Sequence, residues 1–444
     1  MNNLPYQPEQ VLSRLGIKQL NPMQIQTIQT AQENNQEVIL LSETGSGKTL
    51  AFLLSILDKI NWDQKGKIQA LILAPTRELV LQTESVLRKM QLPVKITACY
   101  GGHKREIEEN NLVEPPTILL ATTGRLADHI RRKNLTLEHI HCVVLDEYDK
   151  ILELDFQEEM GFIMPLLPAK AFKLLTSATI LHEIPDFVGL NNPITLNFLS
   201  DDPVDVQKRP VFWINTGEAD KLNTLLHLIA QVKNTSSIVF CNHRDAVERT
   251  QNWLKEQGVL SVFYHGGMDQ LPREVALCKF KNGTSNILIT TDLASRGLDI
   301  PYVRNIIHYH LPHQEDQYIH RNGRTARMDE TGTIYILLAP DEKLPKYMEN
   351  EAEQLSLAED WVIPEKPKWS TLFIAAGKKS KINKIDVVGY LTQKAGLKKD
   401  DIGLIEVKDH TTYVGVRKSK IGLAVEAAKL HKIKNQRIRM EVAK

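Results

Sequence analysis

The chain has 444 residues, of which 42% are hydrophobic and 25% are charged, and its formal net charge is +1. This length allows two or three domains with cores of their own, and the composition is ordinary for a globular protein. No apolar run reaches the roughly 18 residues of a membrane span, the N-terminus lacks the pattern of a signal peptide, and the four cysteines are scattered, so we expect a reduced cytoplasmic protein with no membrane segment.

The near-neutral total hides an asymmetry of charge. Residues 366–444 hold 19 Lys and Arg against 7 Asp and Glu, a net charge of +12, whereas the rest of the chain carries −11. A basic tail on a mildly acidic body suggests that the tail meets a polyanion, although a well-solvated surface would have the same composition.

The N-terminal part of the chain predicts an α/β domain. Residues 6–32 are expected to be helical, and apolar runs typical of strands then recur with helical stretches between them. Continuous apolar strands that alternate with helices indicate a parallel sheet covered on both faces. The expected strands are Val38–Leu41, Ala70–Ala74, Lys95–Tyr100, Thr117–Ala121, Cys142–Leu145 and Lys173–Leu175.

The segment Ser42–Thr49, with the sequence SETGSGKT, has the features of a phosphate-binding loop. A strand precedes it and a helical run follows it, which is the context that such a loop needs. Its glycines let backbone N–H groups converge on phosphate oxygens, and the helix N-terminus adds partial positive charge. Lys48 is expected to reach the β- and γ-phosphates of a nucleoside triphosphate, and Thr49 to place its hydroxyl on Mg²⁺. The alternative, a turn with an exposed lysine, does not account for the flanking strand and helix.

Two acids, Asp146 and Glu147, follow the strand Cys142–Leu145 and are placed to face the nucleotide. Asp146 is expected to hold Mg²⁺ largely through its water shell, and Glu147 to orient and polarise the attacking water. The acids would belong to a solvated loop only if this edge of the sheet faced away from the nucleotide, because a buried acid pair without a cation is costly. After another strand, Ser177 and Thr179 supply hydroxyls that can bond to neighbouring acids.

A linker over residues 197–210 precedes a second α/β series of similar size. Its segment Tyr318–Arg327 packs three arginines into a short span. Phosphoryl transfer needs positive charge where negative charge develops, and the planar guanidinium of arginine supplies it. The alternative is that these arginines form the exposed basic start of a helix. The segment Thr290–Asp299 lies at a strand end, where loops usually carry function. The expected strands are Val211–Ile214, Ile238–Cys241, Val262–Tyr264, Ile287–Ile289, Ile306–Tyr309 and Thr333–Leu338.

Residues 364–368, with the sequence PEKPK, indicate another linker, and the remainder alternates short strands and helices. Its order, βαββαβ, is the ferredoxin-like arrangement that RNA-recognition modules use. The expected elements are Thr371–Ala375, Asp386–Ala395, Ile402–Val407, Tyr413–Val416, Ile421–Leu430 and Ile438–Val442.

Together these motifs resemble those of the DEAD-box RNA helicases over about residues 4–345. The resemblance implies two RecA-like domains, residues 1–205 and 206–362, that close over ATP and RNA, and an RNA-stimulated ATPase that unwinds or remodels short RNA duplexes. It assigns Gln24 to adenine recognition, with Tyr6 as the aromatic that stacks on adenine. The other residues that it assigns to ATP binding or catalysis are Thr44, Gly45, Ser46, Gly47, Lys48, Thr49, Asp146, Glu147, Gly297, Asp299, Arg324 and Arg327.

The resemblance also assigns residues to RNA contact and to the coupling of ATP with unwinding. The coupling residues are Asp149, Ser177, Thr179 and His320. The RNA-contacting motifs of the two domains contribute Pro75, Thr76, Arg77, Gly102, Thr123, Gly124, Arg125, Asn242, Gly266, Gln270, Arg273, Thr291 and Asp292.

The tail, residues 369–444, resembles the RNA-binding domain of the bacterial DbpA-type helicases. The segments that carry this resemblance are Thr371–Lys379, Asp400–Gly403 and Thr412–Val416. Phe373 and Tyr413 fall where RNA-recognition strands present base-stacking aromatics, but strand core explains both equally well. Lys378 and Lys379 are further RNA-binding candidates. The resemblance implies ribosomal RNA of the large subunit as the target, and a pre-ribosomal particle as the partner during ribosome assembly.

Five positions depart from the family's pattern. Ser42 stands in place of the first glycine of the phosphate loop, and Thr123 in place of a proline. Asn322 and Ala326 replace Ile and Gly, and Ala326 would be strained if its φ had to be positive. Tyr148 replaces the alanine of the acid motif, where a larger side chain is expected to crowd the neighbouring hydroxyls.

The leading hypothesis is a monomeric ATP-dependent enzyme that remodels RNA and does not act on DNA. An ATP-gated RNA clamp, an assembly scaffold with little unwinding, is an alternative that Tyr148 and Ala326 favour. A DNA translocase of the same architecture is a third, opposed by the glutamine motif and by the RNA-recognition-like tail. ATP turnover measured with RNA, with DNA and with neither separates these hypotheses.

Overall fold

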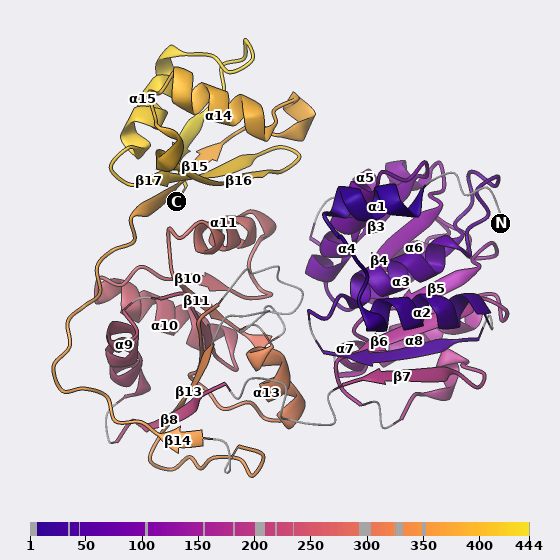
Figure 1. Ribbon diagram of the computed structural model, residues 1–444, viewed down its shortest axis with the longest axis horizontal. Coiled ribbons are helices and arrows are strands. Elements are labelled where there is room, and N and C mark those ends of the chain that lie inside the picture. The colour runs from indigo at the N-terminus through magenta and orange to yellow at the C-terminus, as the bar shows by residue number, and fades with distance from the viewer. Residues whose placement is uncertain are drawn as a thin grey trace. The chain divides into compact units, whose positions relative to one another are not determined.

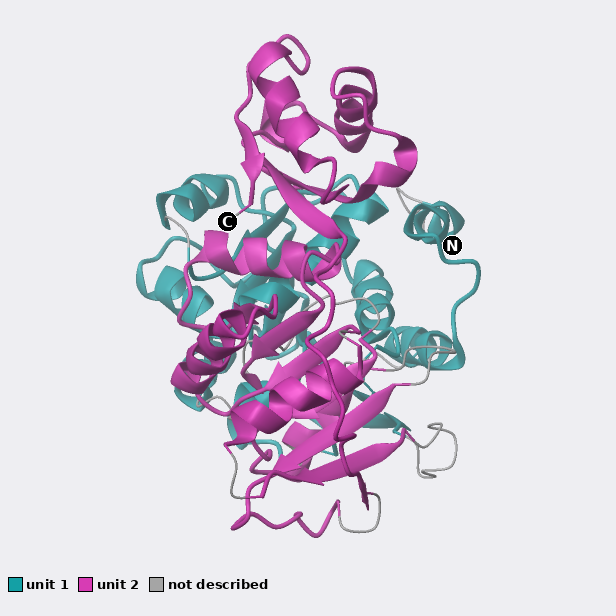
Figure 2. Ribbon diagram, turned by 90° about the vertical axis from the view of Figure 1, so that its left-hand side faces the viewer, with its two compact units in different colours: residues 1–205, 296–299 teal, residues 206–295, 300–444 magenta. Residues whose placement is uncertain are grey.

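The computed structural model of the chain has two compact units, which Figure 2 distinguishes by colour. Unit 1 contains the described residues up to 199, and unit 2 contains the described residues from 209 onward. No helix among the described residues is long and apolar enough to cross a membrane. The structure describes residues 7–33, 36–43, 45–102, 105–153, 156–180, 183–199, 209–217, 220–233, 235–292, 303–323, 325, 332–348 and 352–443.

Unit 1 is built on a seven-stranded parallel sheet with the strand order β3-β4-β2-β5-β6-β1-β7 (Figure 1). The strands are β1 (Val38–Ser42), β2 (Ala70–Ala74), β3 (Ile96–Cys99), β4 (Ile118–Thr122), β5 (Cys142–Leu145), β6 (Phe172–Ser177) and β7 (Ile194–Phe198). The helices are α1 (Pro8–Leu15), α2 (Pro22–Glu33), α3 (Lys48–Leu57), α4 (Arg77–Met90), α5 (Arg105–Leu112), α6 (Thr123–Arg131), α7 (Tyr148–Glu153) and α8 (Gln157–Ile163).

The sheet of unit 1 has a hydrophobic core on each face. Successive side chains of a strand point to opposite faces. Val38 and Leu40 of β1 belong to one core, which α3 and α4 cover, whereas Ile39 and Leu41 belong to the other, which α6 and α8 cover. A strand buried on both faces must be apolar throughout, and this is why continuous apolar runs predicted the parallel sheet correctly.

The N-terminal helix and the first linker differ from the prediction. The helix expected over residues 6–32 is two helices, because Gly16 ends α1 in the left-handed conformation, with φ of 73°, and Pro22 begins α2. The linker begins later than residue 197, because Ile194–Phe198 pairs with β1 as the edge strand β7. This strand is only partly buried, so it lacks the apolar run that identified the others.

Unit 2 contains a second seven-stranded parallel sheet, with the order β10-β11-β9-β12-β13-β8-β14. The strands are β8 (Val211–Asn215), β9 (Ser237–Phe240), β10 (Val262–Tyr264), β11 (Ile287–Thr290), β12 (Asn305–His308), β13 (Thr333–Leu338) and β14 (Ala352–Gln354), of which β14 was not expected. The described helices are α9 (Lys221–Gln231), α10 (Arg244–Glu256), α11 (Gln270–Lys281) and α13 (Glu315–Asn322).

The C-terminal part of unit 2 has the predicted βαββαβ order, which forms an antiparallel sheet of four strands in the order β16-β17-β15-β18. Its elements are β15 (Trp369–Ile374), α14 (Lys384–Gln393), β16 (Ile402–Val407), β17 (Thr412–Arg417), α15 (Ile421–Leu430) and β18 (Met440–Val442). The helices α14 and α15 cover one face of this sheet. The other face packs against α11, as Figure 1 shows.

The contact between α11 and the C-terminal sheet is specific. Asn282, just after α11, donates a hydrogen bond of 2.9 Å to the hydroxyl of Thr371 on β15. The Cβ of Asn282 lies so close to Gly415 on β17 that any side chain at Gly415 would come within 3.1 Å of it. The carboxylate of Glu406 on β16 accepts from the thiol of Cys278 at 3.5 Å. The two α/β folds and the predicted order of the tail are therefore confirmed, and the tail is docked on the second sheet domain.

Candidate functional site

The phosphate-binding loop follows β1 and leads into α3, as its motif predicts. Gly45 and Gly47 have positive φ values of 88° and 97°, which a residue with a side chain rarely adopts. A Cβ on Gly47 would also meet the amide nitrogen of Gln24 at 2.4 Å. The ammonium group of Lys48 donates to the carbonyl of Glu43 at 3.0 Å and to the carbonyl of Ser42. The lysine is therefore held over the loop, at the N-terminus of α3.

Gln24 connects α2 to this loop. Its side-chain amide donates to the carbonyl of Gly47 at 3.3 Å, and its side-chain oxygen accepts from the backbone of Asn21 at 3.0 Å. The side chain of Asn21 in turn donates to the carbonyl of Ser46 at 2.9 Å. Because Gln24 is 93% buried by these contacts, its position depends on the conformation of the loop. Sequence reasoning selected Gln24 but did not select Asn21, which supports the same loop.

The acid pair lies at the same edge of the sheet as the loop. Because β5, β6 and β1 are parallel neighbours, their carboxyl ends meet there. Thr176 of β6 donates to the carboxylate of Asp146 at 2.7 Å and accepts from the backbone N–H of Glu147 at 3.0 Å. One hydroxyl thus fixes both acids, and Thr176 is a site residue that sequence reasoning missed.

Glu147 is held in an unfavourable backbone conformation. Its φ is 49°, in the left-handed region that few non-glycine residues adopt. Strain of this kind persists where the surrounding structure enforces it, and it gathers at functional sites. Here the hydrogen bond from the Glu147 N–H to Thr176 helps to enforce it.

The charges at this edge are buried and act on one another. Burial lowers the pKa of Lys48, and the carboxylates of Glu147, Asp146 and Asp149 oppose this shift. Burial raises the pKa of Asp146, and the hydrogen bond from Thr176 opposes it. Buried acids and a buried lysine that face each other form an environment able to hold a cation and phosphate oxygens.

Three of the four residues predicted to couple ATP to unwinding, Asp149, Ser177 and Thr179, come together in unit 1, whereas His320 belongs to unit 2. The hydroxyl of Thr179 donates to Asp149 at 3.3 Å, and the hydroxyl of Ser177 donates to the carbonyl of Thr179 at 2.6 Å. Tyr148 does not crowd these groups. Its ring is fully buried in the core that contains Ile151, and the hydrogen bonds of Ser177 and Thr179 form in its presence.

The chemistry of the donor set fits an ATP–Mg²⁺ complex. The positive φ at two glycines opens the backbone cradle that phosphate oxygens need. Thr49, half-buried in the first turn of α3, and Asp146 supply hard oxygen donors of the kind that Mg²⁺ prefers. These residues come from separate strands and meet at one sheet edge, so the predicted nucleotide site of unit 1 is coherent.

Two predicted RNA-contacting segments of unit 1 touch each other. The guanidinium of Arg77, at the start of α4, stacks over the ring of Tyr100 at 4.6 Å and donates to the carbonyl of Gly101 at 3.2 Å. Gly102 has φ of 93°, and a Cβ there would meet Arg77 at 2.5 Å. Thr76 caps α4 by accepting from the backbone N–H of Leu79, while Pro75 precedes it at the end of β2.

Arg125 is held by a buried carboxylate that sequence reasoning missed. Glu108 accepts from Arg125 at 3.0 Å, from the backbone of Tyr100 at 2.7 Å and from His129 at 2.8 Å. Asn134 donates to the other ring nitrogen of His129 at 3.0 Å, so the ring nitrogen that faces Glu108 carries the proton. Cys99, Glu108 and His129 lie close enough to hold a metal ion, but these hydrogen bonds occupy Glu108 and His129. The network positions Arg125 and the loop at Tyr100, beside the predicted contacts Thr123 and Gly124 at the start of α6.

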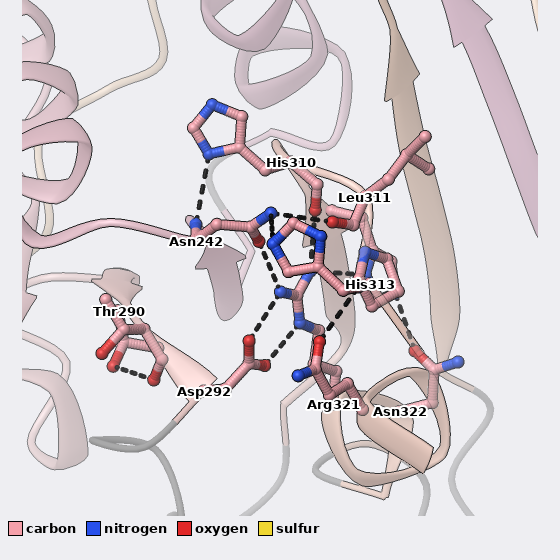
Figure 3. A network of polar contacts seen from close by, with 12 residues as sticks. Asn242, Thr290, Asp292, His310, Leu311, His313, Arg321 and Asn322 are labelled. Carbon is pink, nitrogen blue, oxygen red and sulfur yellow. Dashed lines mark hydrogen bonds and ion pairs between the residues drawn. The ribbon is translucent and has the colours of Figure 1, made fainter. Parts of the chain in front are cut away.

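In unit 2 a buried arginine joins two predicted RNA contacts (Figure 3). Arg321 binds both oxygens of Asp292, at 2.5 and 2.7 Å, and donates to the side chain of Asn242 at 2.8 Å. It is 99% buried and also donates to the carbonyl of His310 at 2.7 Å. Sequence reasoning placed Arg321 in a motif but did not assign it a role, because only the fold shows that it bridges two strand ends.

The substitution Asn322 has a structural partner in the same network. The side-chain oxygen of Asn322 lies 3.0 Å from the Nε2 atom of His308, and Arg321 lies 3.3 Å from its Nδ1 atom. Burial lowers the pKa of His308 to about 3, so this histidine is neutral. Asn322 therefore accepts from the Nε2 proton and fixes the tautomer that leaves Nδ1 facing Arg321.

The other predicted contacts of unit 2 have ordinary partners. Gln270 donates to Glu274 at 2.6 Å within α11, and Arg273 donates to the hydroxyl of Tyr264 at 2.9 Å. Gly266 lies beside Arg244, where a Cβ would find room at 3.6 Å. The two remaining predicted residues, both more than nine-tenths buried, are Thr291 and His320.

The two predicted base-stacking aromatics of the tail, Phe373 and Tyr413, lie on the strands that pack against α11. Their ring centres are 5.7 Å apart; Tyr413 is 1% exposed and Phe373 is half-buried. In this arrangement Tyr413 cannot stack on a base, and stacking there would require the sheet to leave α11. Lys378 and Lys379, by contrast, are exposed in a short turn after β15.

Several predicted residues lie outside the described part of the chain, as does the substitution Ala326. The predicted ATP-site residues outside it are Tyr6, Thr44, Gly297, Asp299, Arg324 and Arg327.

Three known domain families match the chain. Residues 21–187 match the DEAD/DEAH box helicase family, residues 220–329 the helicase conserved C-terminal domain, and residues 371–442 the DbpA RNA binding domain. These matches fall on the first sheet, the second sheet and the antiparallel tail.

Known proteins share this arrangement. The chain is 31% identical to the ATP-dependent RNA helicase DbpA of Escherichia coli over 100% of this chain and 99% of that protein. It is 28% identical to the ATP-dependent RNA helicase DbpA of Bacillus subtilis over 97% of this chain and 96% of that protein. Among solved structures, S. cerevisiae Dbp5 bound to RNA and ADP BeF3 is 27% identical with a TM-score of 0.66, and the match covers 76% of this chain and 89% of that one.

Proposed function

The chain belongs to the DEAD-box family of ATP-dependent RNA helicases, in the group with a DbpA RNA-binding domain, and from this premise we propose how its own residues carry the activity. It is an RNA-stimulated ATPase and RNA helicase. The proposals concern the roles of individual residues, the metal, and the RNA on which the enzyme acts.

We assign ATP binding to the loop between β1 and α3. Lys48 leaves the loop carbonyls to bind the β- and γ-phosphates, and Gln24 reads the adenine. Thr49 and Asp146 hold Mg²⁺, largely through water, and the metal supplies charge neutralisation at the phosphates. Tyr6, Thr44, Gly297 and Asp299 complete the proposed nucleotide contacts.

Glu147 is the proposed general base. Its backbone is fixed by Thr176, so its carboxylate is positioned before the substrate arrives, and it orients and polarises the attacking water. Arg324 and Arg327 supply positive charge as negative charge develops on the γ-phosphoryl group. The observation that carries this assignment is the network in which one threonine hydroxyl fixes both acids beside the phosphate loop.

RNA contact is assigned to both units. Arg77 and Arg125 are held in place by Tyr100 and Glu108, and Asn242 and Asp292 are joined by Arg321. Further contacts come from the predicted residues of these motifs, and Asp149, Ser177, Thr179 and His320 relay the state of the nucleotide. ATP and RNA then favour one another because each binds better to the same closed state.

We propose that the RNA target is ribosomal, in large-subunit assembly, with the basic tail as the anchor. This rests on the resemblance of the tail and on its net charge of +12 over residues 366–444. Lys378 and Lys379, both exposed, are the proposed anchor residues. A monomeric protein that works in the cytoplasm on pre-ribosomal particles, and not on DNA, is the corresponding expectation.

The test is steady-state ATP hydrolysis by the full chain with ribosomal RNA, random-sequence RNA, DNA or no nucleic acid. We expect turnover to rise with RNA only, and most with ribosomal RNA. Glu147→Gln should lower turnover by about 10²–10⁴-fold while ATP and RNA still bind. The exposed glutamate of α8, changed as Glu158→Gln, is the matched control and should behave as wild type.

Two results would contradict these proposals. Turnover of Glu147→Gln within twofold of wild type would remove Glu147 as the base, a margin far inside the expected loss. Equal stimulation by ribosomal and random RNA would remove the ribosomal target. Strand displacement on a short duplex separates a helicase from an ATP-gated clamp, which would hold RNA in ATP without displacing a strand.

A further inference from the structure

A hollow of about 880 Å³ lies within unit 2, where residues 362–369 pass between the turn after α11 and the C-terminal sheet. Cationic side chains from four segments of the chain converge on it, with a single acid among them. The charged residues that line it are Lys233, Lys281, Lys366, Lys368, Arg417 and Glu365. None of them is among the individual residues assigned above to ATP or RNA, although Lys366, Lys368 and Arg417 contribute to the basic charge of residues 366–444.

Most of this positive charge has no anionic partner. Lys281 lies 3.5 Å from Glu406. The remaining four cations, in contrast, make no ion pair with another described residue. Lys233, Lys366 and Lys368 are exposed, and Arg417 is half-buried. Like charges gathered around one hollow repel each other, so they raise the affinity of the hollow for a polyanion.

Arg417 is held in a fixed orientation. Its guanidinium lies 4.4 Å from the ring centre of Trp369, as in a cation–π contact. The ring of Trp369 is itself fixed, because a Cβ on Gly403 would meet it at 3.1 Å and a Cβ on Gly283 at 3.4 Å. Gly283 has φ of 73°, which also favours glycine there. One side of the guanidinium plane is therefore covered by an aromatic ring.

The two walls of the hollow keep their spacing. One wall is the turn after α11 and the other is the C-terminal sheet, and the hydrogen bond of 2.9 Å between Asn282 and Thr371 joins them. Thr284 and Thr371 are linked by a second hydrogen bond of 2.8 Å. A preformed site loses less conformational entropy when it binds a ligand.

We propose that this hollow binds the sugar–phosphate backbone of a single-stranded RNA segment that extends from the RNA on which the helicase acts. Lysines around an open groove contact phosphates without regard to sequence. An arginine plane fixed on a tryptophan offers a surface on which an unpaired base can stack. Single-stranded RNA uses both features, whereas an acidic peptide would use only the charge. The proposal rests on the proposed function, because it requires that the enzyme bind RNA.

The test is the salt dependence of RNA binding by the full chain without nucleotide. The probes are a fluorescein-labelled blunt RNA duplex and the same duplex with an oligouridine tail, and the readout is fluorescence anisotropy. The variant is Lys366→Gln with Lys368→Gln. The matched control is Lys343→Gln with Lys346→Gln, which removes two exposed lysines of unit 2 that do not line the hollow.

For the tailed duplex, each lost contact with a single-stranded phosphate lowers the salt slope by about 0.7, so the double variant loses about 1.4. Between about 50 and 200 mM salt, wild-type affinity should therefore fall about sevenfold more than the affinity of the variant. The blunt duplex should bind both proteins equally. Arg417→Lys keeps the charge but removes the plane on which a base stacks, so it should weaken binding of the tailed duplex while leaving the salt slope unchanged.

The proposal would be overturned if, on the tailed duplex, the salt dependence of binding had the same slope for wild type, for the Lys366→Gln, Lys368→Gln variant and for the control. A slope change of the same size on the blunt duplex would also overturn it, because it would show a general loss of charge. RNA-stimulated ATP hydrolysis by the same proteins tests the proposed function separately from the RNA site in the hollow. If RNA stimulates the wild type but the oligouridine extension of the duplex has no effect on binding, the assignment of the hollow fails and the proposed function stands.

Discussion

Tyr148 occupies the position where the family's acid motif has alanine, and its environment predicts opposite effects for two substitutions. The side chain is fully buried, and its hydroxyl has no hydrogen-bond partner among the described residues. A buried hydroxyl without a partner costs about 1–3 kcal/mol. We expect Tyr148→Phe to raise the free energy of unfolding of unit 1 by about 1–2 kcal/mol, because the ring keeps its contacts and the unpaired group is removed.

Tyr148→Ala should do the reverse. The ring packs in the core with Leu145, Ile151 and Leu175, and its removal leaves a cavity that costs about 3–5 kcal/mol. Neither substitution should change the rate of ATP hydrolysis per folded molecule by more than about twofold, a change of about 0.4 kcal/mol in the activation barrier. The ring points into the core, and the hydrogen bonds of Thr179 and Asp149 do not involve it.

Calorimetric thermal unfolding of the full chain measures these effects, and the transition that shifts with ATP identifies unit 1. Each kcal/mol corresponds to about 2–4 °C for a unit of this size. The control is Tyr390→Phe, another buried tyrosine whose hydroxyl has no partner among the described residues, which should shift only the transition of unit 2. A less stable Tyr148→Phe would mean that the hydroxyl is bonded after all. A several-fold faster Tyr148→Ala would restore the idea that Tyr148 crowds the acid motif and limits turnover.

Three further predictions follow from buried groups. Burial lowers the pKa of His308 to about 3 and of His310 to about 4, below the unfolded value, so both contribute stability that is complete above about pH 6.5 and is lost as pH falls. Urea unfolding should show unit 2 less stable at about pH 5 than at pH 7, by about 2 kcal/mol for the fully buried His308 and by less for the partly exposed His310. An equal stability at both pH values would contradict this. All four cysteines are buried, and burial raises the pKa of each thiol, so a disulfide reagent should label them slowly in the native protein and fully in denaturant; fast native labelling would refute the packing. Glu108→Gln leaves Arg125 without its buried counter-charge and should cost about 3–5 kcal/mol of stability. It should also raise the RNA concentration for half-maximal ATP hydrolysis without changing the rate at saturating RNA. A lowered rate at saturating RNA alone would place Glu108 elsewhere in the mechanism.

The sequence predicted which side chains of unit 1 come together at one edge of its sheet, because strands and loops there follow local rules. A run such as Cys142–Leu145 is apolar on both faces, and the acids after it must lie at a sheet edge. Thr176 was missed although a signal existed. Leu175 pairs with Leu145 in the parallel register, so the next residue on β6 faces the next residue after β5.

Contacts between elements distant in the chain were beyond the reach of pattern reasoning. Glu108 and Arg125 lie on separate helices, and no spacing in the sequence indicates that they meet. The burial of Tyr413 depends on the docking of the tail on α11. The sequence indicates this docking only weakly, by the glycine at position 415, which lies opposite Asn282. An aromatic on a strand suits both a base and a helix, so the sequence could not decide between them.

The two parallel sheets have the same strand order, so the architecture of the chain offers two topologically equivalent places for a nucleotide. In unit 1 the helix after the first strand of the sheet, α3, follows Gly47, which has no side chain to cap the N-terminal N–H groups of the helix. In unit 2 the equivalent helix, α9, is capped by the preceding residue, Asp220, whose carboxylate accepts from the N–H of Leu222 at 3.2 Å. An anionic cap occupies the helix N-terminus at which a phosphate would bind, and its negative charge repels a phosphate. We therefore expect one nucleotide per chain, bound at the uncapped helix of unit 1, although both units have the same strand order.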